Sequence, residues 1–374
     1  MSSSSIDAVE SATPTTTVSA APPASPTTDA PATVMTPAPA PSPAPVPAGP
    51  AEPTAVATGL DTPWGLDALP DGRAVITERD TGRVRTVAPD GTVGELGTVA
   101  GVVPGGEGGL LGVVVAPGFD AATISGTLLV MYTAADDNRV ARLTVTDGAI
   151  AGQQVVLEGM PKGRIHNGGR LAIGPDGFLY VGTGDSGDSA LAQDLGSLGG
   201  KILRLQLDGS PAPGAPFPEA PLVFSLGHRN VQGLAFDAAG RLWAAEFGQN
   251  TWDELNLITA GANYGWPEVE GMGGDPRFTD PHRVWTTDEA SPSGLAITGG
   301  SAWMAGLGGE RLWQVPLIDE TTGEPVPRFA DEFGRLRSVL ARPGGILWIT
   351  TSNTDGRGDP RDGDDQLLVW DTDG

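Results

Sequence analysis

The chain has 374 residues, a formal net charge of −24 at neutral pH and no cysteine. The missing cysteines exclude disulfides, thiolate metal sites and thiol catalysis. No cluster of lysine and arginine is visible, so we expect neither a nucleic-acid partner nor an anionic membrane surface as a partner. No apolar run approaches the ~18 residues of a membrane span, which argues against direct membrane insertion. The acidity either promotes solubility alone or places carboxylates around a cation such as calcium.

Residues 1–52 consist almost entirely of Ala, Pro, Ser and Thr. Such a segment has too little apolar surface to offset its loss of conformational entropy, so we expect a disordered, semi-stiff linker. Linkers of this kind often hold exported domains away from a cell surface, and an arbitrary tail is the alternative. No signal peptide is visible in the sequence as written. The linker nevertheless favours an extracellular or cell-envelope location.

Residues 53–374 contain a weak repeat in which strand-like alternation of apolar and polar residues is broken by Pro, Asp and Gly turns. Six units begin at Trp64, Leu111, Gly169, Gln232, Ser293 and Leu336. The period-2 alternation is typical of strands, and a repeat of roughly 45 to 60 residues is typical of propellers or solenoids. We therefore predict an all-β, six-bladed β-propeller of four-stranded antiparallel blades, closed by pairing between the last unit and the first.

His166 is the first candidate for chemistry and stands directly before the inner strand of the third unit, in "RIHNGGRL". It should face the mouth of the central channel, where a histidine suits general-base work. The alternative is a histidine that only bonds a loop carbonyl. Asp185 lies in an Asp-rich loop, 184–201, that could bind a cation or line a cleft. Long insertions after Asp185 and after Trp266 should lie on one face and build the site.

Two groups of polar residues flank inner strands of the fourth and sixth units. Arg229, Asn230 and Gln232 precede or begin the fourth, and arginine presents planar donors to carboxylates or to a developing oxyanion. The alternative is a polar clasp between blades. Arg335 and Arg337 lie two apart on a strand and should point the same way. Two arginines in one channel would repel unless an anion sits there, and the alternative is that both lie in water.

Gly248 and Gln249 form a turn beside Asp253 and Glu254. Backbone carbonyls and carboxylates are the oxygen ligands that calcium prefers, so this turn is a candidate calcium site. Carboxylates in turns are also commonly just solvated. The acidic stretch 353–365 is superficially similar to an EF-hand loop but lacks the final spacing to a glutamate, so we expect a solvated hairpin.

Taken together and in this order, seven motifs resemble the soluble pyrroloquinoline-quinone-dependent sugar dehydrogenases, also called glucose/sorbosone dehydrogenases. The motifs are "PWGL", "GGEGGLLG", "IHNGGRL", "LGSLGGKILRL", "GHRNVQGLAF", "NYGWP" and "GRLRSV". The resemblance covers about residues 54–372. It implies an oxidoreductase that oxidises an aldose or polyol by hydride transfer to pyrroloquinoline quinone, with a calcium ion bound to the quinone.

The resemblance also implies a role for each candidate residue. His166 is the general base that takes the proton of the sugar hydroxyl, and Arg229 polarises the quinone oxygen. The remaining assignments are Asn230, Arg335 and Arg337 to the cofactor, Asp185 and Gln232 to the substrate pocket, and the carbonyls of Gly248 and Gln249 to calcium. No motif indicates the electron acceptor.

Two positions depart from the family pattern. Gly308 stands where strongly active members carry a cofactor-binding lysine, and Ile165 precedes the base where the glucose enzyme has an aspartate. These departures leave two other hypotheses. One is a non-catalytic extracellular carbohydrate-binding propeller that has lost the cofactor, and the other is a metal-dependent lactonase, by analogy of fold.

Overall fold

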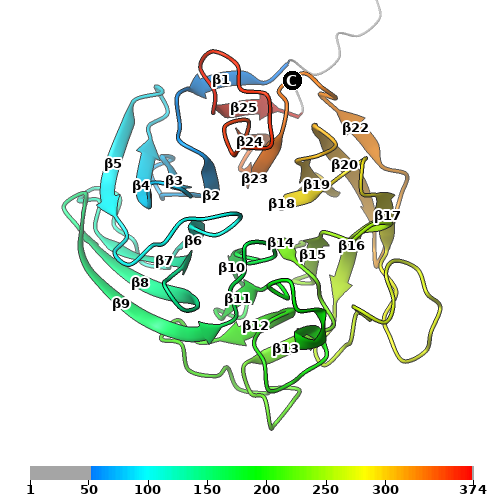
Figure 1. Cartoon of the computed structure of the whole chain (residues 1–374). Helices are drawn as coiled ribbons and strands as arrows, with labels where there is room; N and C mark the ends of the chain where they lie inside the picture. The colour runs from blue at the N-terminus through cyan, green and yellow to red at the C-terminus, as the bar shows by residue number, and fades with distance from the viewer. Residues whose placement is uncertain (1–51, 373–374) are drawn as a thin grey trace, which may run out of the picture. The chain divides into compact units, whose positions relative to one another are not determined.

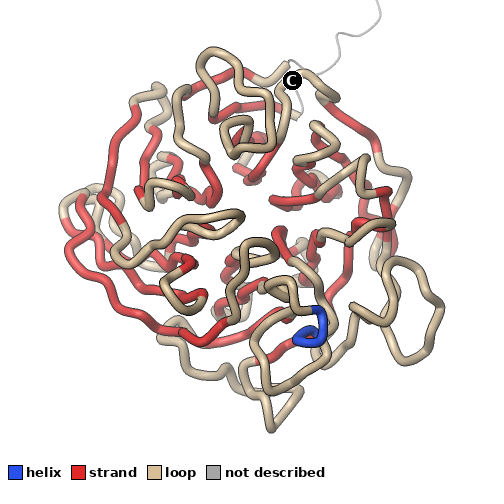
Figure 2. The backbone as a smooth tube through the Cα atoms, in the orientation of Figure 1, coloured by secondary structure: helices blue, strands red, loops and turns tan. Residues whose placement is uncertain are grey.

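The computed structural model describes residues 52–372, which form a ring of six antiparallel sheets around a central channel (Figure 1). Figure 2 shows that strands and loops make up nearly all of this ring. In the described part of the chain, no helix is long and apolar enough to cross a membrane. The predicted linker over residues 1–52 falls outside the described residues except for Glu52. The linker, and the location inferred from it, therefore stay predictions.

The first three strands of each blade run outward from the channel in chain order, and the sixth blade is completed by β1 (Thr54–Ala57) from the start of the described chain. The first three blades are β2 (Pro63–Ala68), β3 (Ala74–Glu78), β4 (Arg83–Val87) and β5 (Val93–Thr98); β6 (Leu110–Val115), β7 (Gly126–Thr133), β8 (Asn138–Thr146) and β9 (Ala149–Met160); and β10 (Leu171–Ile173), β11 (Leu179–Gly182), β12 (Lys201–Leu205) and β13 (Val223–Leu226). A short 3₁₀ helix, Ser189–Ala192, lies between β11 and β12.

The last three blades close the ring. They are β14 (Val231–Phe236), β15 (Leu242–Glu246), β16 (Trp252–Ile258) and β17 (Arg283–Thr286); β18 (Pro292–Thr298), β19 (Ser301–Gly306), β20 (Arg311–Ile318), β21 (Thr321–Thr322) and β22 (Val326–Arg328); and β23 (Leu336–Arg342), β24 (Ile346–Thr351), β25 (Leu367–Asp371) and β1 (Thr54–Ala57). The predicted propeller is confirmed. The fifth blade has an added short strand, and β1 closes the ring by pairing antiparallel with β25.

The hydrophobic core is divided among the interfaces between neighbouring blades. Six buried clusters lie there, and each draws apolar residues from two adjacent blades. Between the fifth and sixth blades, for example, Trp303 packs edge-on against Trp370 with ring centroids 5.4 Å apart. Full burial of one large apolar side chain stabilises a fold by about 2 kcal/mol. The blades are therefore held to one another by the alternating residues that the sequence pattern shows.

The loops that build the site all emerge on one face of the ring. They are the loops that join successive blades and those that follow the second strand of each blade. On the other face, tight hairpins join the first and second strands, and Gly72 takes the positive φ of 92° that the first of them requires. The two long insertions both reach the site face, where the indole Nε1–H of Trp266 donates to Asp185 at 2.9 Å.

Candidate active site

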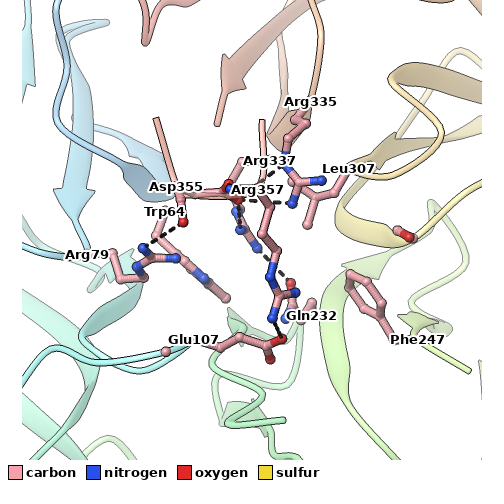
Figure 3. A pocket seen from close by; sticks show the side chains of 12 residues that line it. Trp64, Arg79, Glu107, Gln232, Phe247, Leu307, Arg335, Arg337, Asp355 and Arg357 are labelled. Atoms are coloured by element: carbon pink, nitrogen blue, oxygen red, sulfur yellow. Dashed lines mark hydrogen bonds and ion pairs between the residues drawn. The ribbon is translucent and has the colours of Figure 1, made fainter. Parts of the chain in front are cut away.

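A cavity of about 250 Å³ opens at the site face of the channel (Figure 3). Its charged lining consists of four arginines and two carboxylates: Arg79, Arg335, Arg337, Arg357, Glu107 and Asp355. Trp64, Gln232, Phe247 and Leu307 complete the lining that Figure 3 labels. The pocket therefore carries a surplus of positive charge inside a chain whose net charge is −24.

Arg335 and Arg337 point to the same side, as their spacing predicts, and a carboxylate of the protein lies between them. Oδ2 of Asp355 accepts hydrogen bonds from Nη2 of Arg335 at 3.0 Å and from Nη2 of Arg337 at 3.4 Å. Burial alone would raise the pKa of Asp355, but the two guanidinium charges hold this pKa below its ordinary value. The anion that the arginine pair requires is thus supplied by the chain itself.

The prediction of a solvated hairpin over residues 353–365 is correct for its middle, because the stretch joins antiparallel strands and residues 359–363 are exposed, but it is wrong for the two ends. The side chains of Asn353 and Asp365 are buried because they bind the backbone of this part of the fold. The Asn353 side-chain oxygen accepts the N–H of Arg335 at 2.9 Å, and Asp365 accepts the N–H of Asn353 at 2.6 Å. The acidic loop therefore folds inward and delivers Asp355 to the pocket.

Gln232 lies at the floor of the pocket, bound to the arginine pair. Its side-chain oxygen accepts from Nη1 of Arg337 at 2.9 Å and from the hydroxyl of Ser293 at 3.1 Å. Arg337 is buried, its Nε has no hydrogen-bond partner, and burial lowers its pKa to about 10. The free Nε is a donor with no acceptor from the protein. The assignment of Gln232 to the substrate stays a prediction.

The partly exposed His166 pairs with the buried Asp185. Nδ1 of His166 lies 2.7 Å from Oδ1 of Asp185. The same carboxylate accepts the Gly187 N–H at 2.8 Å and the Trp266 indole N–H at 2.9 Å. Burial would raise the pKa of Asp185, but the donors His166 and Gly187 keep it below its ordinary value. An ionised Asp185 selects the His166 tautomer with the proton on Nδ1 and leaves Nε2 as a proton acceptor.

Glu107 fixes the backbone of His166 and was missed by sequence reasoning. His166 adopts a left-handed conformation with φ of 55°, which is costly for a residue with a side chain. Its backbone N–H donates to Oε2 of Glu107 at 2.8 Å, while Oε1 of Glu107 pairs with Arg357 at 2.9 Å across the pocket. The signal that could have found Glu107 is a single charged residue inside the glycine-rich stretch "GGEGG".

Arg229 and Asn230 come from the loop before β14 and occupy different environments. The guanidinium of Arg229 lies over the ring of Trp266 at 5.5 Å, and its buried Nε has no hydrogen-bond partner. Burial lowers the pKa of Arg229. The side-chain oxygen of Asn230 accepts the Gly168 N–H at 3.0 Å and so ties this loop to the one after His166. Asn230 therefore does act as a clasp between blades, and its cofactor role stays a prediction.

Two carboxylates accept the backbone N–H groups of the turn at Gly248 and Gln249. The Gly248 N–H donates to Asp253 at 2.9 Å, and the Gln249 N–H donates to Glu270 at 2.6 Å. A Cβ at Gly248 would collide with the carbonyl oxygen of Trp252, so this position needs glycine. Among the described residues, no hydrogen bond uses the carbonyl oxygen of either turn residue. Both carbonyls are therefore available as ligands.

The acidic residues around this turn are unusually buried. Burial raises the pKa of Asp253 to about 6. Burial and the neighbouring charge of Glu246 raise the pKa of Glu254 to about 8. Within residues 52–372, no group of three or more His, Asp or Glu side chains is arranged to hold a metal ion. A cation at the turn would therefore rely on backbone oxygens for its protein ligands.

A six-bladed propeller with a histidine–aspartate pair beside an arginine-rich channel mouth has the arrangement that the sequence motifs imply for a propeller oxidoreductase. The family model described as Glucose / Sorbosone dehydrogenase matches residues 60–367. The chain belongs to this family.

Individual relatives agree with the family match. A solved structure of the aldose sugar dehydrogenase of Streptomyces coelicolor with pyrroloquinoline quinone bound is 51% identical, has a TM-score of 0.82, and is matched over 87% of this chain and 99% of that one. The aldose sugar dehydrogenase YliI of Escherichia coli is 29% identical over 79% of this chain and 89% of its own length. Quinoprotein glucose dehydrogenase B of Acinetobacter calcoaceticus is 34% identical, but the match covers 60% of this chain and 54% of that protein.

Proposed function

We propose that this chain is a dehydrogenase that oxidises a sugar or polyol hydroxyl, with pyrroloquinoline quinone in the arginine-rich pocket and calcium on the turn at Gly248 and Gln249. The observation that carries the proposal is the His166–Asp185 pair, which leaves Nε2 of His166 without a hydrogen-bond partner among the described residues. Glu107 links this pair to the arginine-rich pocket because it both lines the pocket and binds the backbone of His166.

The pocket suits a planar quinone that carries several carboxylates. Arginine is the side chain best shaped to bind carboxylates through paired N–H donors. The four guanidinium groups outnumber the two carboxylates of the pocket, and the buried Nε of Arg337 lacks an acceptor. Trp64 adds a flat aromatic surface to the lining. When bound, the quinone supplies a hydride acceptor that no amino-acid side chain can provide.

The missing lysine has a structural substitute in this chain. At Gly308, a Cβ would crowd the hydroxyl of Ser291, and it is the neighbouring Leu307 that lines the pocket. Arg357 instead brings a cation into the pocket from the acidic loop, where it pairs with Glu107. We propose that Arg357 supplies the positive charge that a lysine at position 308 provides in the family.

The residues of the chain have distinct parts in the reaction. Asp185 keeps the proton of His166 on Nδ1, so that Nε2 accepts the proton of the sugar hydroxyl. The carboxylate then stabilises the imidazolium that forms. We assign to Arg229, which lines a small neighbouring cavity together with Gly248, the donation to an oxygen that gains negative charge. The water-poor surroundings of Arg229 strengthen this interaction.

A titration of the full chain with pyrroloquinoline quinone, with and without calcium and followed by tryptophan fluorescence, tests the cofactor. We expect saturable, calcium-dependent binding in the micromolar range or tighter. His166→Ala should keep this binding but lose turnover of sugars with an artificial acceptor. The matched control is His282→Ala, because His282 lies in the half-buried loop before β17. Absence of binding at tens of micromolar quinone, or full turnover by His166→Ala, would refute the proposal.

A carbohydrate-binding propeller without a cofactor is the second candidate, because Gly308 replaces the lysine. It predicts the opposite pattern in the same assays. A sugar would bind to the chain in the absence of quinone, His166→Ala would leave that binding unchanged, and no acceptor would be reduced.

A further inference from the structure

The opposite mouth of the channel holds a second cavity of about 400 Å³. It is lined by the later residues of the six inner strands, β2, β6, β10, β14, β18 and β23, which surround the centre of the ring in Figure 1. Much of its wall is aliphatic and includes Leu66, Val114, Leu234, Leu295 and Val339. The inner strands also stand at the ends of their sheets and present unpaired backbone edges to the channel. A cavity that combines apolar side chains with polar groups in this way can hold a small molecule.

Arg170 forms the polar end of this cavity. It is only 8% exposed, and its guanidinium lies over the ring of Trp64 at 4.5 Å. Nε donates to the carbonyl of Gln232 at 2.6 Å, and Nη2 donates to the hydroxyl of Ser338 at 3.1 Å. Nη1 donates no hydrogen bond to any of the described residues. The guanidinium therefore keeps one free N–H edge in a cavity that it lines.

No carboxylate balances the charge of Arg170. The other four channel arginines each have a partner: Arg79 pairs with Asp80, Arg335 and Arg337 with Asp355, and Arg357 with Glu107. Among the described residues, no acidic side chain lies within ion-pair distance of Arg170. Burial, reinforced by the charge of Arg337, lowers the pKa of Arg170 to about 9. A buried cation is costly unless an anion accompanies it.

Asp67 is the one carboxylate among the described residues that line the cavity, and it lies away from Arg170. It stands three residues beyond Trp64 on β2, which is about 10 Å along a strand. Both of its oxygens are occupied, because they accept the N–H groups of Ala68 at 2.8 Å and Val115 at 2.6 Å. The deep end of the cavity is thus positive and its middle is apolar.

We propose that this second cavity binds a small organic monocarboxylate with an apolar body. The carboxylate accepts from Nη1 of Arg170, and the body packs against the aliphatic wall. An inorganic anion would leave the apolar part of that wall uncovered. The site lies on the far side of Trp64 and Gln232 from the quinone pocket and goes beyond the proposed dehydrogenase function, because neither the quinone nor His166 takes part in it.

Benzoate is the probe, and the full wild-type chain is the protein. Calorimetry should show saturable binding with a dissociation constant on the order of 1 mM, as expected for a ligand of this size. Benzamide, which has the same shape without the charge, should bind at least about tenfold more weakly. Crystals soaked in 4-bromobenzoate should show the anomalous bromine signal in the cavity beside Arg170.

Two variants assign the binding to Arg170. Arg170→Met keeps the apolar stem but should lose benzoate binding by about tenfold or more. Arg277→Gln is the control, because Arg277 is an exposed arginine that pairs with Glu268 and Asp275 and does not line the cavity; it should bind like the wild type. If Arg170→Met fails to fold, the benzamide comparison and the bromine position still show whether the carboxylate binds at Arg170. Equal binding of benzamide, a bromine signal only beside Arg335 and Arg337, or no saturable benzoate binding would overturn the proposal.

Discussion

Glu107 accepts the backbone N–H of His166 at 2.8 Å, and this bond joins the wall of the arginine-rich pocket to the proposed base. Without an acceptor at this point, the left-handed conformation of His166 would lose its local support. We therefore expect Glu107→Ala to lower kcat by roughly tenfold, because the base is misplaced. Glu107→Gln keeps an acceptor oxygen and should restore most of kcat. Equal losses in both variants would show that the charge, and not the acceptor, is what matters.

Asp185→Asn tests the tautomer argument. An amide in place of the carboxylate can donate to Nδ1 of His166, so that the proton moves to Nε2 and the acceptor is lost. We expect kcat to fall by roughly 10³-fold, while the affinity for the quinone stays near that of the wild type. Asp188→Asn, in the same loop, caps the 3₁₀ helix and should leave kcat almost unchanged. A wild-type kcat for Asp185→Asn would remove the pair from the mechanism.

Asp355→Asn should reveal the ion pairs of Asp355 as a pH-dependent part of stability. Because the folded-state pKa of Asp355 is lowered, its contribution is present above the unfolded value of 3.8 and is lost as pH falls through the folded value. At pH 7 the variant should lose about 2 kcal/mol of unfolding free energy. Near pH 3 the difference should shrink. Denaturant titrations at both pH values measure it, and a loss of the same size at both would contradict this account.

Arg357→Gln should weaken quinone binding by about tenfold, since one charge-assisted contact is removed. Arg357→Lys should recover much of the affinity. Arg361→Gln is the control: it lies on the same exposed loop but contacts the carbonyl of Glu332 and does not line the pocket. Fluorescence titration with the quinone at saturating calcium compares the three variants. If Arg361→Gln weakens quinone binding as much as Arg357→Gln, the proposal that Arg357 contacts the quinone is wrong.

Gly248→Ala should disturb the turn at which we propose calcium binding. The added Cβ would meet the Trp252 carbonyl, so the turn must shift and its free carbonyl oxygens with it. We expect the calcium concentration for half-maximal quinone binding to rise by about tenfold or more. Gly152→Ala, on the outer strand β9, adds a Cβ at ordinary contact distance and should change nothing. An unchanged calcium requirement in Gly248→Ala would place the ion elsewhere.

The local sequence pattern was sufficient to predict the fold and part of the candidate site. Alternating strands, Asp-Gly turns and the six-fold repeat predict the blades, because these signals arise within one blade at a time. The position of His166 just before an inner strand predicts that it lies at the channel mouth. The fate of the acidic loop 353–365 was not predictable in this way. Its local composition is that of a solvated turn, and only its contact with Arg335 and Arg337 explains the inward fold.

The sequence by itself determined the strand pattern, the number of blades and the family of this protein, since each is encoded in short stretches read in order. The tertiary structure alone decided the electrostatics of the channel. A chain with a net charge of −24 brings four arginines to one pocket and, among residues 52–372, leaves Arg170 without a carboxylate partner. Ring closure causes this, because it brings together residues as distant in the chain as Gln232 and Arg337. Coulomb interactions depend on those distances in space and not on composition.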